Sequence, residues 1–308
     1  MRVRVDSIGC RLNIGEMEQL ARRLAAAGHR IVGPGDSADL FLFNSCAVTH
    51  VASRKSRKIL RQIRRENPDA AIVATGCYAE LSPERCRELG VDMLVGNADK
   101  DRLPGILTDA GLLHSGDPVP EADAAPVDDV ADSRTRAFVK VQDGCDNRCT
   151  FCIVTRARGD GRSRPLDDVV AEIDGLVALG YREAVLSGVH LGSWGQDLDD
   201  GTDLSTLVAA ILERTEIPRL RLSSLEPWDL DEEFFGLWQD PRLLPHLHLP
   251  LQSGCDLTLA RMARNTTRAE FADLVDAARR AIPGVAVSTD VIVGFFGEDD
   301  AEFEDSLG

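Results

Sequence analysis

Strand-like and helical segments alternate along both halves of the chain. This pattern predicts an α/β protein with an N-terminal parallel α/β sheet domain followed by a partial (β/α) barrel. The 308 residues, 44% of them hydrophobic, suffice for about two domains with separate cores. Residues 116–133, GDPVPEADAAPVDDVADS, hold six acidic residues, three prolines and no basic residue. Such a stretch buries too little apolar surface to fold, so we expect a solvated linker between domains 1–115 and 134–308.

The first 115 residues alternate between short apolar runs and helical patterns, as expected for a parallel sheet flanked by helices. Asn67-Pro68 ends the second helical pattern, because the residue before a proline disfavours the helical backbone. The predicted strands cover residues 3–8, 40–43, 71–74 and 92–95, and the predicted helices cover 14–27, 51–65, 83–89 and 101–113.

The second part repeats the alternation, with five strand–helix units in residues 134–308. This arrangement favours a β/α barrel or part of one, with a doubly wound open sheet as the alternative. The predicted strands cover 137–141, 183–187, 220–223, 246–249 and 285–293. The predicted helices cover 166–179, 204–214, 231–238 and 268–281, and the final AEFEDSLG also has a helical pattern.

The net charge of −16 argues against a nucleic-acid partner for the chain as a whole, because phosphate binding requires Lys and Arg. Residues 1–115, however, carry 17 basic and 14 acidic side chains, so the acidic excess lies in the linker and the second part. No run approaches the roughly 18 apolar residues of a membrane helix, and MRVRVDSIGCRLN lacks a secretory apolar core. We therefore expect a cytoplasmic protein without a membrane partner, whose eight cysteines indicate metal or redox chemistry.

Cys145, Cys149 and Cys152 form a C-x3-C-x2-C pattern after the first predicted strand of the second part, and we name them the loop triad. Three thiolates in one loop can face one metal centre, whereas a structural zinc site normally has four ligands. An iron–sulfur cluster held by three cysteines leaves one iron open to bind another molecule. The alternatives are a zinc site completed by Cys255, or cysteines buried as small hydrophobic residues. Position and spacing favour the open cluster, and we expect Cys86 and Cys255 to be packing residues.

Cys10, Cys46 and Cys77 are distant in sequence, but each follows a predicted strand, and we name them the sheet triad. Ligands gather at the carboxyl ends of parallel strands, so we expect these thiols to converge and hold a second cluster. Neighbouring Gly9 and Gly76 permit tight turns or close backbone approach. The alternative is three half-buried free cysteines at loop starts.

With these two triads the sequence resembles the radical S-adenosylmethionine methylthiotransferases. The resemblance rests on the sheet triad together with VQDGCDNRCTFCIVTRARGDGRSRP and LHLPLQSGCD, and it covers nearly the whole chain except the linker. NSCAVTHVASRKSRKILR and LSGVHLGSWGQDL resemble the MtaB branch, which modifies N6-threonylcarbamoyladenosine beside the tRNA anticodon. The MiaB branch, which modifies isopentenyladenosine, and the RimO branch, which modifies a ribosomal protein aspartate, usually depart from both strings.

The resemblance implies two 4Fe-4S clusters and S-adenosylmethionine as cofactors. The cluster on the loop triad would bind the amino and carboxylate groups of S-adenosylmethionine, whose reductive cleavage gives a 5′-deoxyadenosyl radical. This radical would remove hydrogen from C2 of the adenine, and the cluster on the sheet triad would deliver a methylated sulfur. Because that carbon is unactivated, polar acid–base catalysis would not suffice, and the cofactors carry the difficult step.

Other positions carry over from the resemblance as candidate contacts for S-adenosylmethionine, since polar groups at the carboxyl ends of barrel strands face the site. They are Ser187, Gly188, Glu226, Gln252 and Arg264. Each could equally be an exposed or capping residue. Asp290 and VIVGFFGE resemble the family's fifth-strand motif, except that Phe296 stands where family members commonly have proline.

Residues 54–65, RKSRKILRQIRR, carry seven basic side chains and no acidic one. At helical spacing they form a broad basic surface, with Ile59 and Ile63 on another side. A solvated charged face is the usual explanation for such a run, but the absence of acids in so acidic a protein favours RNA contact. The predicted RNA-binding residues are Arg54, Arg57, Lys58, Arg61, Arg64 and Arg65.

The resemblance also implies partners: a tRNA anticodon stem-loop, and reduced ferredoxin or flavodoxin as electron donor. A second basic loop, with Arg156, Arg158, Arg162 and Arg164, could meet RNA or the carboxylate of the cofactor. Family members continue past AEFEDSLG into a sixth barrel strand and an RNA-binding TRAM domain, so we expect an open barrel without that domain. Alternatives from other classes are a noncatalytic RNA-binding module with structural zinc and, more weakly, a disulfide-forming reductase.

Overall fold

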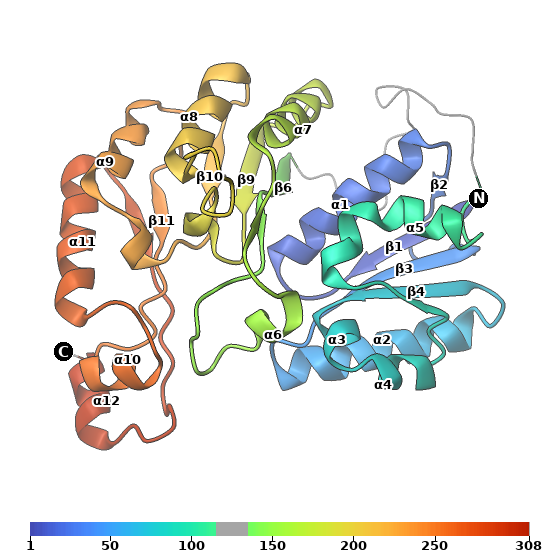
Figure 1. Ribbon diagram of the computed structural model, residues 1–308, viewed down its shortest axis with the longest axis horizontal. Helices are drawn as coiled ribbons and strands as arrows, with labels where there is room; N and C mark the ends of the chain where they lie inside the picture. Colours follow the sequence, from blue (N-terminus) through green and yellow to red (C-terminus); the bar gives the residue numbers. More distant parts are fainter. Residues whose placement is uncertain (115–134, 308) are drawn as a thin grey trace. The chain divides into compact units, whose positions relative to one another are not determined.

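The structure, a computed structural model, describes residues 1–114 and 135–307, and the predicted linker lies outside these residues (Figure 1). The chain forms two compact units. The first comprises the described part of Met1–Arg134 together with Arg156–Gly159, and the second comprises Thr135–Thr155 and Asp160–Gly308. The short excursion Arg156–Gly159 therefore belongs to the first unit, although it follows the loop triad in the chain.

The first unit has a parallel sheet between two layers of helices (Figure 1). Its strand order, β2-β1-β3-β4-β5, reverses at β1, so that β1 and β3 flank a topological switch point. The strands are β1 (Arg2–Ser7), β2 (Arg30–Ile31), β3 (Leu40–Ser45), β4 (Ala71–Gly76) and β5 (Met93–Leu94).

Two groups of helices cover the two faces of this sheet (Figure 1). One face carries α1 (Arg11–Ala26), η1 (Asn97–Arg102) and α5 (Leu103–Asp109), and the other carries α2 (His50–Glu66), α3 (Cys77–Leu81) and α4 (Pro83–Glu88). The central strand β3 is buried throughout, and its alternate residues divide between the layers. Leu40 and Leu42 pack in the core on the α1 side, and Phe41 and Phe43 in the core on the α2 side.

The second unit has parallel strands whose lateral order follows the chain without reversal. Strands β6, β9 and β10 form one sheet and β11 and β12 another, while single bridges, Leu220 with Leu243 and Ser224 with His248, join the two. This continuous order is that of a barrel sector and excludes the doubly wound alternative for the described part of this unit. The strands are β6 (Arg136–Lys140), β9 (Glu183–Ser187), β10 (Leu220–Leu222), β11 (His246–His248) and β12 (Ala286–Ser288), with a separate antiparallel pair, β7 (Gln142–Asp143) and β8 (Arg162–Ser163).

Helices cover the outer face of these strands (Figure 1). Alternate strand residues, such as Val139, Leu186 and Leu247, pack against them in one apolar core. The intervening residues, such as Lys140 and Ser187, lie on the opposite face by the two-residue period of a strand. The helices with residues in this core are α7 (Leu166–Ala178), η2 (Leu191–Ser193), α8 (Leu204–Arg214), α9 (Glu232–Phe235), η4 (Gly236–Gln239) and α11 (Arg268–Ala281). The other helices that the structure describes after residue 135 are η3 (Pro227–Asp229), α10 (Asp256–Arg261), α12 (Asp300–Leu307) and α6 (Val154–Arg158), of which Arg156–Arg158 belong to the first unit.

The predicted elements agree with the structure except where segments are short or irregular. The predicted strand 285–293 is regular only over Ala286–Ser288, followed by a single bridge between Gln252 and Val291. The predicted helix 231–238 consists of α9 and the 3-10 turn η4. The elements β2, α3, α6 and α10 were not predicted, because two to six residues do not establish a period. No helix in residues 1–114 or 135–307 is long and apolar enough to span a bilayer.

Candidate functional site

The sheet triad lies at the carboxyl ends of three neighbouring strands. Cys10 follows β1 as the N-cap of α1, Cys46 follows β3, and Cys77 begins α3 directly after β4. All three thiols are free; Cys10 is exposed, and Cys46 and Cys77 are buried. Burial is the main cause that raises the pKa of Cys46, and the thiols of Cys77 and Cys10 raise it further, against a backbone hydrogen bond at Val48. Cys46 therefore lies within electrostatic reach of both other thiols.

Two glycines let these loops approach closely. Gly9 has a φ of +117°, and a Cβ there would lie 2.7 Å from Cβ and 2.8 Å from Sγ of Cys46. Gly76 has a φ of +91°, and a Cβ there would lie 2.2 Å from the carbonyl oxygen of Ser45. From α2, the Ser56 hydroxyl accepts a bond from the Cys46 N–H at 3.1 Å and donates one to the Cys46 carbonyl at 2.9 Å. The position of Cys46 is thus fixed by backbone packing on both sides.

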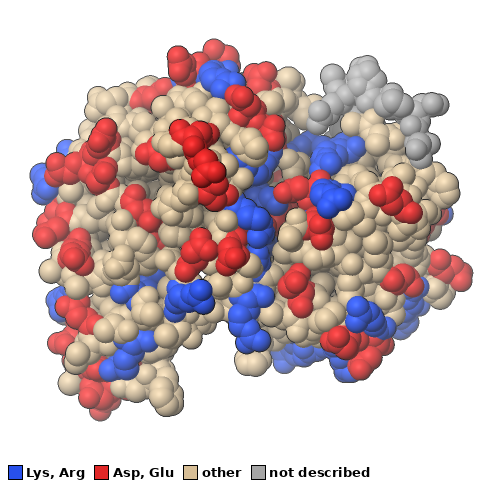
Figure 2. All heavy atoms as spheres, in the orientation of Figure 1, with Lys and Arg blue, Asp and Glu red and all other residues tan. Residues whose placement is uncertain are grey.

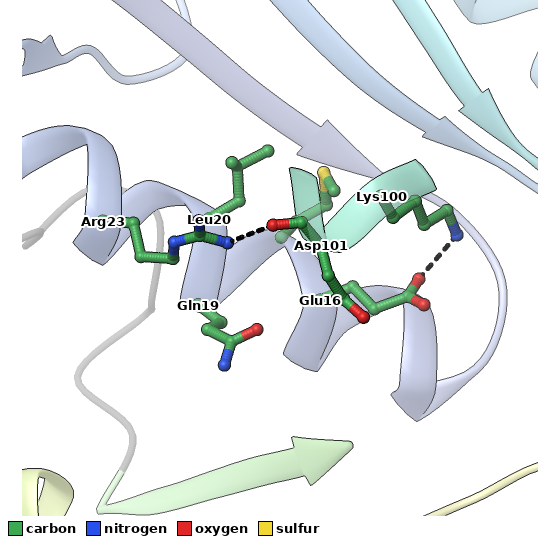
Figure 3. A pocket seen from close by; sticks show the side chains of 7 residues that line it. Glu16, Gln19, Leu20, Arg23, Lys100 and Asp101 are labelled. Carbon is green, nitrogen blue, oxygen red and sulfur yellow. Dashed lines mark hydrogen bonds and ion pairs between the residues drawn. The ribbon is translucent and has the colours of Figure 1, made fainter. Parts of the chain in front are cut away.

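A buried polar network lies beside the sheet triad. Glu16 on α1 accepts a hydrogen bond from Lys100 at 2.7 Å (Figure 3). It accepts another from Arg158 at 3.1 Å. The side chains of these three residues are 2–4% exposed. Buried charges of this kind require ion-pair partners, because removing a charge from water without one is costly.

The loop triad lies between β7 and α6. Cys145 and Cys149 are half-buried and Cys152 is exposed, and all are free thiols. Although Cys152 as a residue is exposed, the protein around it removes part of the hydration of its thiol, and this desolvation is the main cause that raises its pKa. Cys149, Cys145 and Glu226 raise it further, against a hydrogen bond from the Val154 N–H. These thiols also lie within electrostatic reach of one another.

Arg264 is buried behind the loop triad, with its guanidinium 4.5 Å from the centre of the Trp228 ring. Its Nη1 lies 3.8 Å from the Cys149 sulfur, and its Nη2 donates to Glu226 at 2.6 Å and to the Pro250 carbonyl. Burial opposes its positive charge, but the bonds to Glu226 and Cys149 raise the pKa of Arg264 above its ordinary value. Two of the predicted cofactor contacts, Glu226 and Arg264, are therefore ion-paired next to this triad.

His190 is the residue beside the loop triad that the sequence prediction missed. Its Nε2 lies 2.7 Å from Asp229, and its backbone N–H donates to Gln142 at 2.8 Å. Burial opposes protonation, but Asp229 and a hydrogen bond to Cys145 raise the pKa of His190 to about 10. His190 follows Ser187 at the carboxyl end of β9, so its place after a strand was the available signal.

The other predicted cofactor contacts lie at strand ends of the same unit. Ser187 ends β9 and is buried, with its hydroxyl donating to the Val185 carbonyl at 3.3 Å. A Cβ at Gly188 would lie 3.1 Å from Oε1 of Gln142, so the absence of a side chain permits this approach. Gln252 has a φ of 78°, a left-handed backbone that is strained for a residue other than glycine.

The predicted RNA-binding residues on α2 differ in their exposure. Arg54, Lys58, Arg61 and Arg65 are exposed and follow one another at four, three and four residues, so they form one stripe. We name these four residues the basic stripe, and Figure 2 shows basic side chains gathered where α2 runs. Acidic side chains are spread over the second unit in the same view.

The remaining arginines of both predicted basic segments, apart from Arg156, bind within the protein. Arg57 lies over the Tyr78 ring at 5.8 Å, and Arg64 donates to the carbonyls of Pro68, Ala70 and Gly90 at 2.7–3.1 Å. In the second segment, Arg158 is buried, Arg162 lies 3.8 Å from Asp143, and Arg164 pairs with Glu172 at 2.6 Å. Arg156 is exposed.

Both triads consist of free thiols, the donor type that iron–sulfur clusters use. No group of three or more His, Cys, Asp or Glu side chains in residues 1–114 and 135–307 is arranged to hold a single metal ion. A cubane cluster places its thiolates further apart, since each binds a different iron atom.

Cys86 and Cys255, expected to be packing residues, are both buried, and burial raises the pKa of Cys86 to about 11.

Two family models match the chain. The Radical SAM superfamily matches residues 139–308, and Uncharacterized protein family UPF0004 matches residues 2–96. The chain is 38% identical to threonylcarbamoyladenosine tRNA methylthiotransferase MtaB of Thermotoga maritima, covering 99% of this chain and 70% of the relative. It is 37% identical to MtaB of Bacillus subtilis, covering 98% and 68%. It is also 37% identical to tRNA-2-methylthio-N(6)-dimethylallyladenosine synthase of Anaeromyxobacter dehalogenans, covering 99% and 67%.

Solved structures share the fold at low sequence identity. The radical S-adenosylmethionine methyltransferase TsrM of Kitasatospora setae has a TM-score of 0.70 at 16% identity, covering 99% of this chain and 70% of that one. The cobalamin-dependent S-adenosylmethionine radical enzyme OxsB has a TM-score of 0.66 at 12% identity, covering 99% and 51%.

Proposed function

The chain belongs to the radical S-adenosylmethionine superfamily, as one of its methylthiotransferases, and we propose that its substrate is N6-threonylcarbamoyladenosine next to the anticodon of tRNA. It would insert a methylthio group at C2 of the adenine. The observation that carries this proposal is the presence of two cysteine triads in two separate units of one chain, one at the carboxyl ends of three parallel strands and the other in a single loop after β7. Cleavage of S-adenosylmethionine and delivery of sulfur each require a cluster of their own.

Enzymes of this family use S-adenosylmethionine and 4Fe-4S clusters. When bound, these groups supply an electron, a radical that removes the C2 hydrogen, and the methylated sulfur that replaces it. The loop triad would hold one cluster with one iron left open to S-adenosylmethionine, and the sheet triad would hold the other. All six cysteines therefore serve as ligands in this proposal.

Residues beside the loop triad hold it in place. Gln142 donates to the Gly144 carbonyl at 2.9 Å and accepts the His190 N–H, which ties the start of the loop to the end of β9. Thr150 donates from its backbone to the Met262 carbonyl at 3.1 Å, which anchors the middle of the loop. The ion pair of Arg264 and Glu226 lies behind the loop. The Nε–H of Arg264 has no hydrogen-bond partner, so it could donate to a bound carboxylate.

The five predicted contacts for S-adenosylmethionine stay within this proposal. Glu226 and Arg264 have the strongest support, because they adjoin Cys149 and Cys152. Ser187 and Gly188 lie at the end of β9 next to the loop of His190, and Gln252 has a strained backbone of the kind found at binding sites.

The proposed partners are a tRNA anticodon stem-loop and reduced ferredoxin or flavodoxin as electron donor, and the proposed location is the cytoplasm. The basic stripe on α2 supports RNA contact, because its four exposed cations can neutralise phosphates along one helix face. Arg57 and Arg64, which bind within the protein, would contribute through the local shape of this surface.

Nucleoside mass spectrometry of tRNA tests the substrate. Cells that lack this gene should lose 2-methylthio-N6-threonylcarbamoyladenosine, and the parent gene should restore it, while the loop-triad alanine variant should not. Loss of the 2-methylthio isopentenyl nucleoside instead would favour the second candidate, supported by the similarity to a dimethylallyladenosine synthase. A methylthio group missing from a ribosomal protein aspartate would favour the RimO reaction.

Metal and sulfide analysis of anaerobically purified protein tests the class of protein. Iron with labile sulfide supports the enzyme. Zinc without sulfide at both triads would refute the assignment as an enzyme and favour a noncatalytic RNA-binding module.

A further inference from the structure

Arg158 stands six residues after Cys152 in the chain but is buried in the first unit, 4% exposed. Its Nη1 donates to Glu16 at 3.1 Å, and its Nη2 donates to Oδ1 of Asn13 at 2.6 Å. Both acceptors lie on α1, the helix that Cys10 caps. Arg158 thus binds to the first turns of the helix that begins at a member of the sheet triad.

Asn13 connects two of the cysteine loops. Its Nδ2 donates to the Ile8 carbonyl at 2.8 Å and to the Ser45 carbonyl at 3.3 Å. Ile8 precedes Gly9 and Cys10, and Ser45 directly precedes Cys46. The amide can make both bonds only when its oxygen faces the other way, and that oxygen accepts the bond from Arg158.

Glu16 gives Arg158 a second anchor. Its other carboxylate oxygen accepts bonds from Lys100 at 2.7 Å and from Asn44 Nδ2 at 2.8 Å, and the Asn44 oxygen accepts a second bond from Lys100 at 3.2 Å. Asn44 lies near the end of β3, so the network runs across the switch point between β1 and β3. The Cys10 sulfur lies 3.7 Å from Oδ1 of Asn13, the same oxygen that accepts the bond from Arg158, so the guanidinium charge lies next to a thiol of the triad.

We infer that Arg158 is a positioning residue for the cluster on the sheet triad: it orients Asn13, so that the loops of Cys10 and Cys46 keep one spacing, and it places a positive charge beside the cluster. This inference rests on the proposed function, which assigns a cluster to that triad. Hydrogen bonds and nearby charge tune the reduction potential of a cluster. A positive charge stabilises the more negative, reduced state, so its removal should make reduction harder.

The test uses the full chain with Cys145, Cys149 and Cys152 replaced by Ala, so that a cluster can form only on the sheet triad. Three variants are compared with this background: Arg158→Gln, Arg158→Lys and, as a matched control, Arg23→Gln. Arg23 is an exposed arginine on α1, the helix that carries Asn13 and Glu16. Its guanidinium donates to the Asp101 carbonyl at 2.8 Å (Figure 3). The measurements are iron and sulfide content, the electron paramagnetic resonance spectrum of the reduced cluster, and its midpoint potential.

Arg158→Gln should shift the midpoint potential to a more negative value and change the spectrum. Arg158→Lys should recover part of the potential, because it keeps the charge, but not the parent spectrum, because one ammonium group does not reproduce the fork to Asn13 and Glu16. Arg23→Gln should match the background in both.

Parent values of both quantities in Arg158→Gln would overturn the inference. If Arg158→Gln binds no iron, Arg158→Lys decides: a shifted potential or spectrum supports the inference, and parent values overturn it. A background protein that binds no iron–sulfur cluster would instead refute the proposed function itself, so the two failures are distinguishable.

Discussion

Both units place three cysteines in segments that follow strands, but they do so by different routes. The loop triad lies within eight residues, so one loop supplies all its thiols. The sheet triad spans residues 10–77, and its thiols meet because β1, β3 and β4 are neighbours in register. A local motif therefore depends on the conformation of one loop, whereas a dispersed site depends on the integrity of a whole sheet.

The two units also differ in the order of their strands. The reversed order of the first unit creates a switch point, and Cys10 and Cys46 flank it. The continuous order of the second unit creates a barrel sector, and the loop triad follows its first strand. Each triad also has a buried cation held by a carboxylate: Arg158 with Glu16 in one unit, and His190 with Asp229 in the other.

The largest effects are expected when one triad is removed at a time, because each variant should lose a different step of the reaction. Alanine at Cys145, Cys149 and Cys152 should abolish cleavage of S-adenosylmethionine, while the cluster absorbance of the other triad remains. Alanine at the sheet triad should still permit formation of 5′-deoxyadenosine but stop sulfur insertion. The assays are 5′-deoxyadenosine by chromatography and methylthio nucleoside by mass spectrometry.

Cleavage at the parent rate in the loop-triad variant would disprove the role of that triad. Methylthiolation that persists without the sheet triad would refute its assignment as the site of sulfur delivery.

A side chain at Gly76 should separate the strands that bring the sheet triad together. Gly76→Ala places a Cβ against the Ser45 carbonyl in a left-handed backbone, so we expect a loss of about 2–4 kcal/mol in the free energy of unfolding. Iron at the sheet triad should fall, and iron at the loop triad should not. Denaturant titration and iron analysis of the separate triad variants measure both effects.

Gly175→Ala is the matched control in the second unit. Gly175 lies within α7 with no heavy atom within 4 Å of an added Cβ, so alanine should stabilise by about 0.5–1 kcal/mol. Equal iron loss at both triads in Gly76→Ala would contradict the dependence of one triad on sheet register.

The difference between the two triads also explains what the sequence could predict. The alternation of apolar and polar residues predicts the fold class, because long elements such as α1 and α11 show a clear period. It also indicates six cysteines as candidate ligands, because each follows a strand or belongs to a short motif, and their role as ligands stays a prediction. It cannot predict the network beside the sheet triad, because Lys100 and Glu16 are 84 positions apart, Arg158 and Asn13 are 145 apart, and such pairs meet only after folding. Similarly, Arg64 looks like its basic neighbours in sequence, but its donors bind backbone carbonyls.

The basic stripe tests whether the first unit also contributes RNA affinity. Replacement of Arg54, Lys58, Arg61 and Arg65 by Gln should weaken binding of a tRNA anticodon stem-loop and reduce its dependence on salt. Each lost phosphate contact lowers the log–log slope by about 0.7–0.9, so four would lower it by about 3. Fluorescence anisotropy at several salt concentrations measures the slope.

Arg85→Gln is the control for charge alone, since Arg85 is exposed on α4 of the same unit and ion-paired with Glu88. An unchanged slope in the fourfold variant, or an equal change in Arg85→Gln, would remove the basic stripe from the RNA surface.

The smallest expected effect is a difference between Arg158 and His190 in how their contributions to the free energy of unfolding depend on pH. Arg158 keeps its charge over the accessible range, but His190 has a pKa of about 10 in the folded protein against 6.5 in an unperturbed histidine. Because the folded state binds this proton more tightly, the stabilisation is complete below about pH 6.5 and is lost as the pH rises through about 10. In cluster-free protein, the cost of His190→Gln in free energy of unfolding should therefore shrink by about 1–2 kcal/mol between these limits, as measured by urea titration. Arg158→Gln should show a cost that is constant over the same range; a constant cost for His190→Gln as well would mean that Asp229 does not hold the imidazole in its charged form.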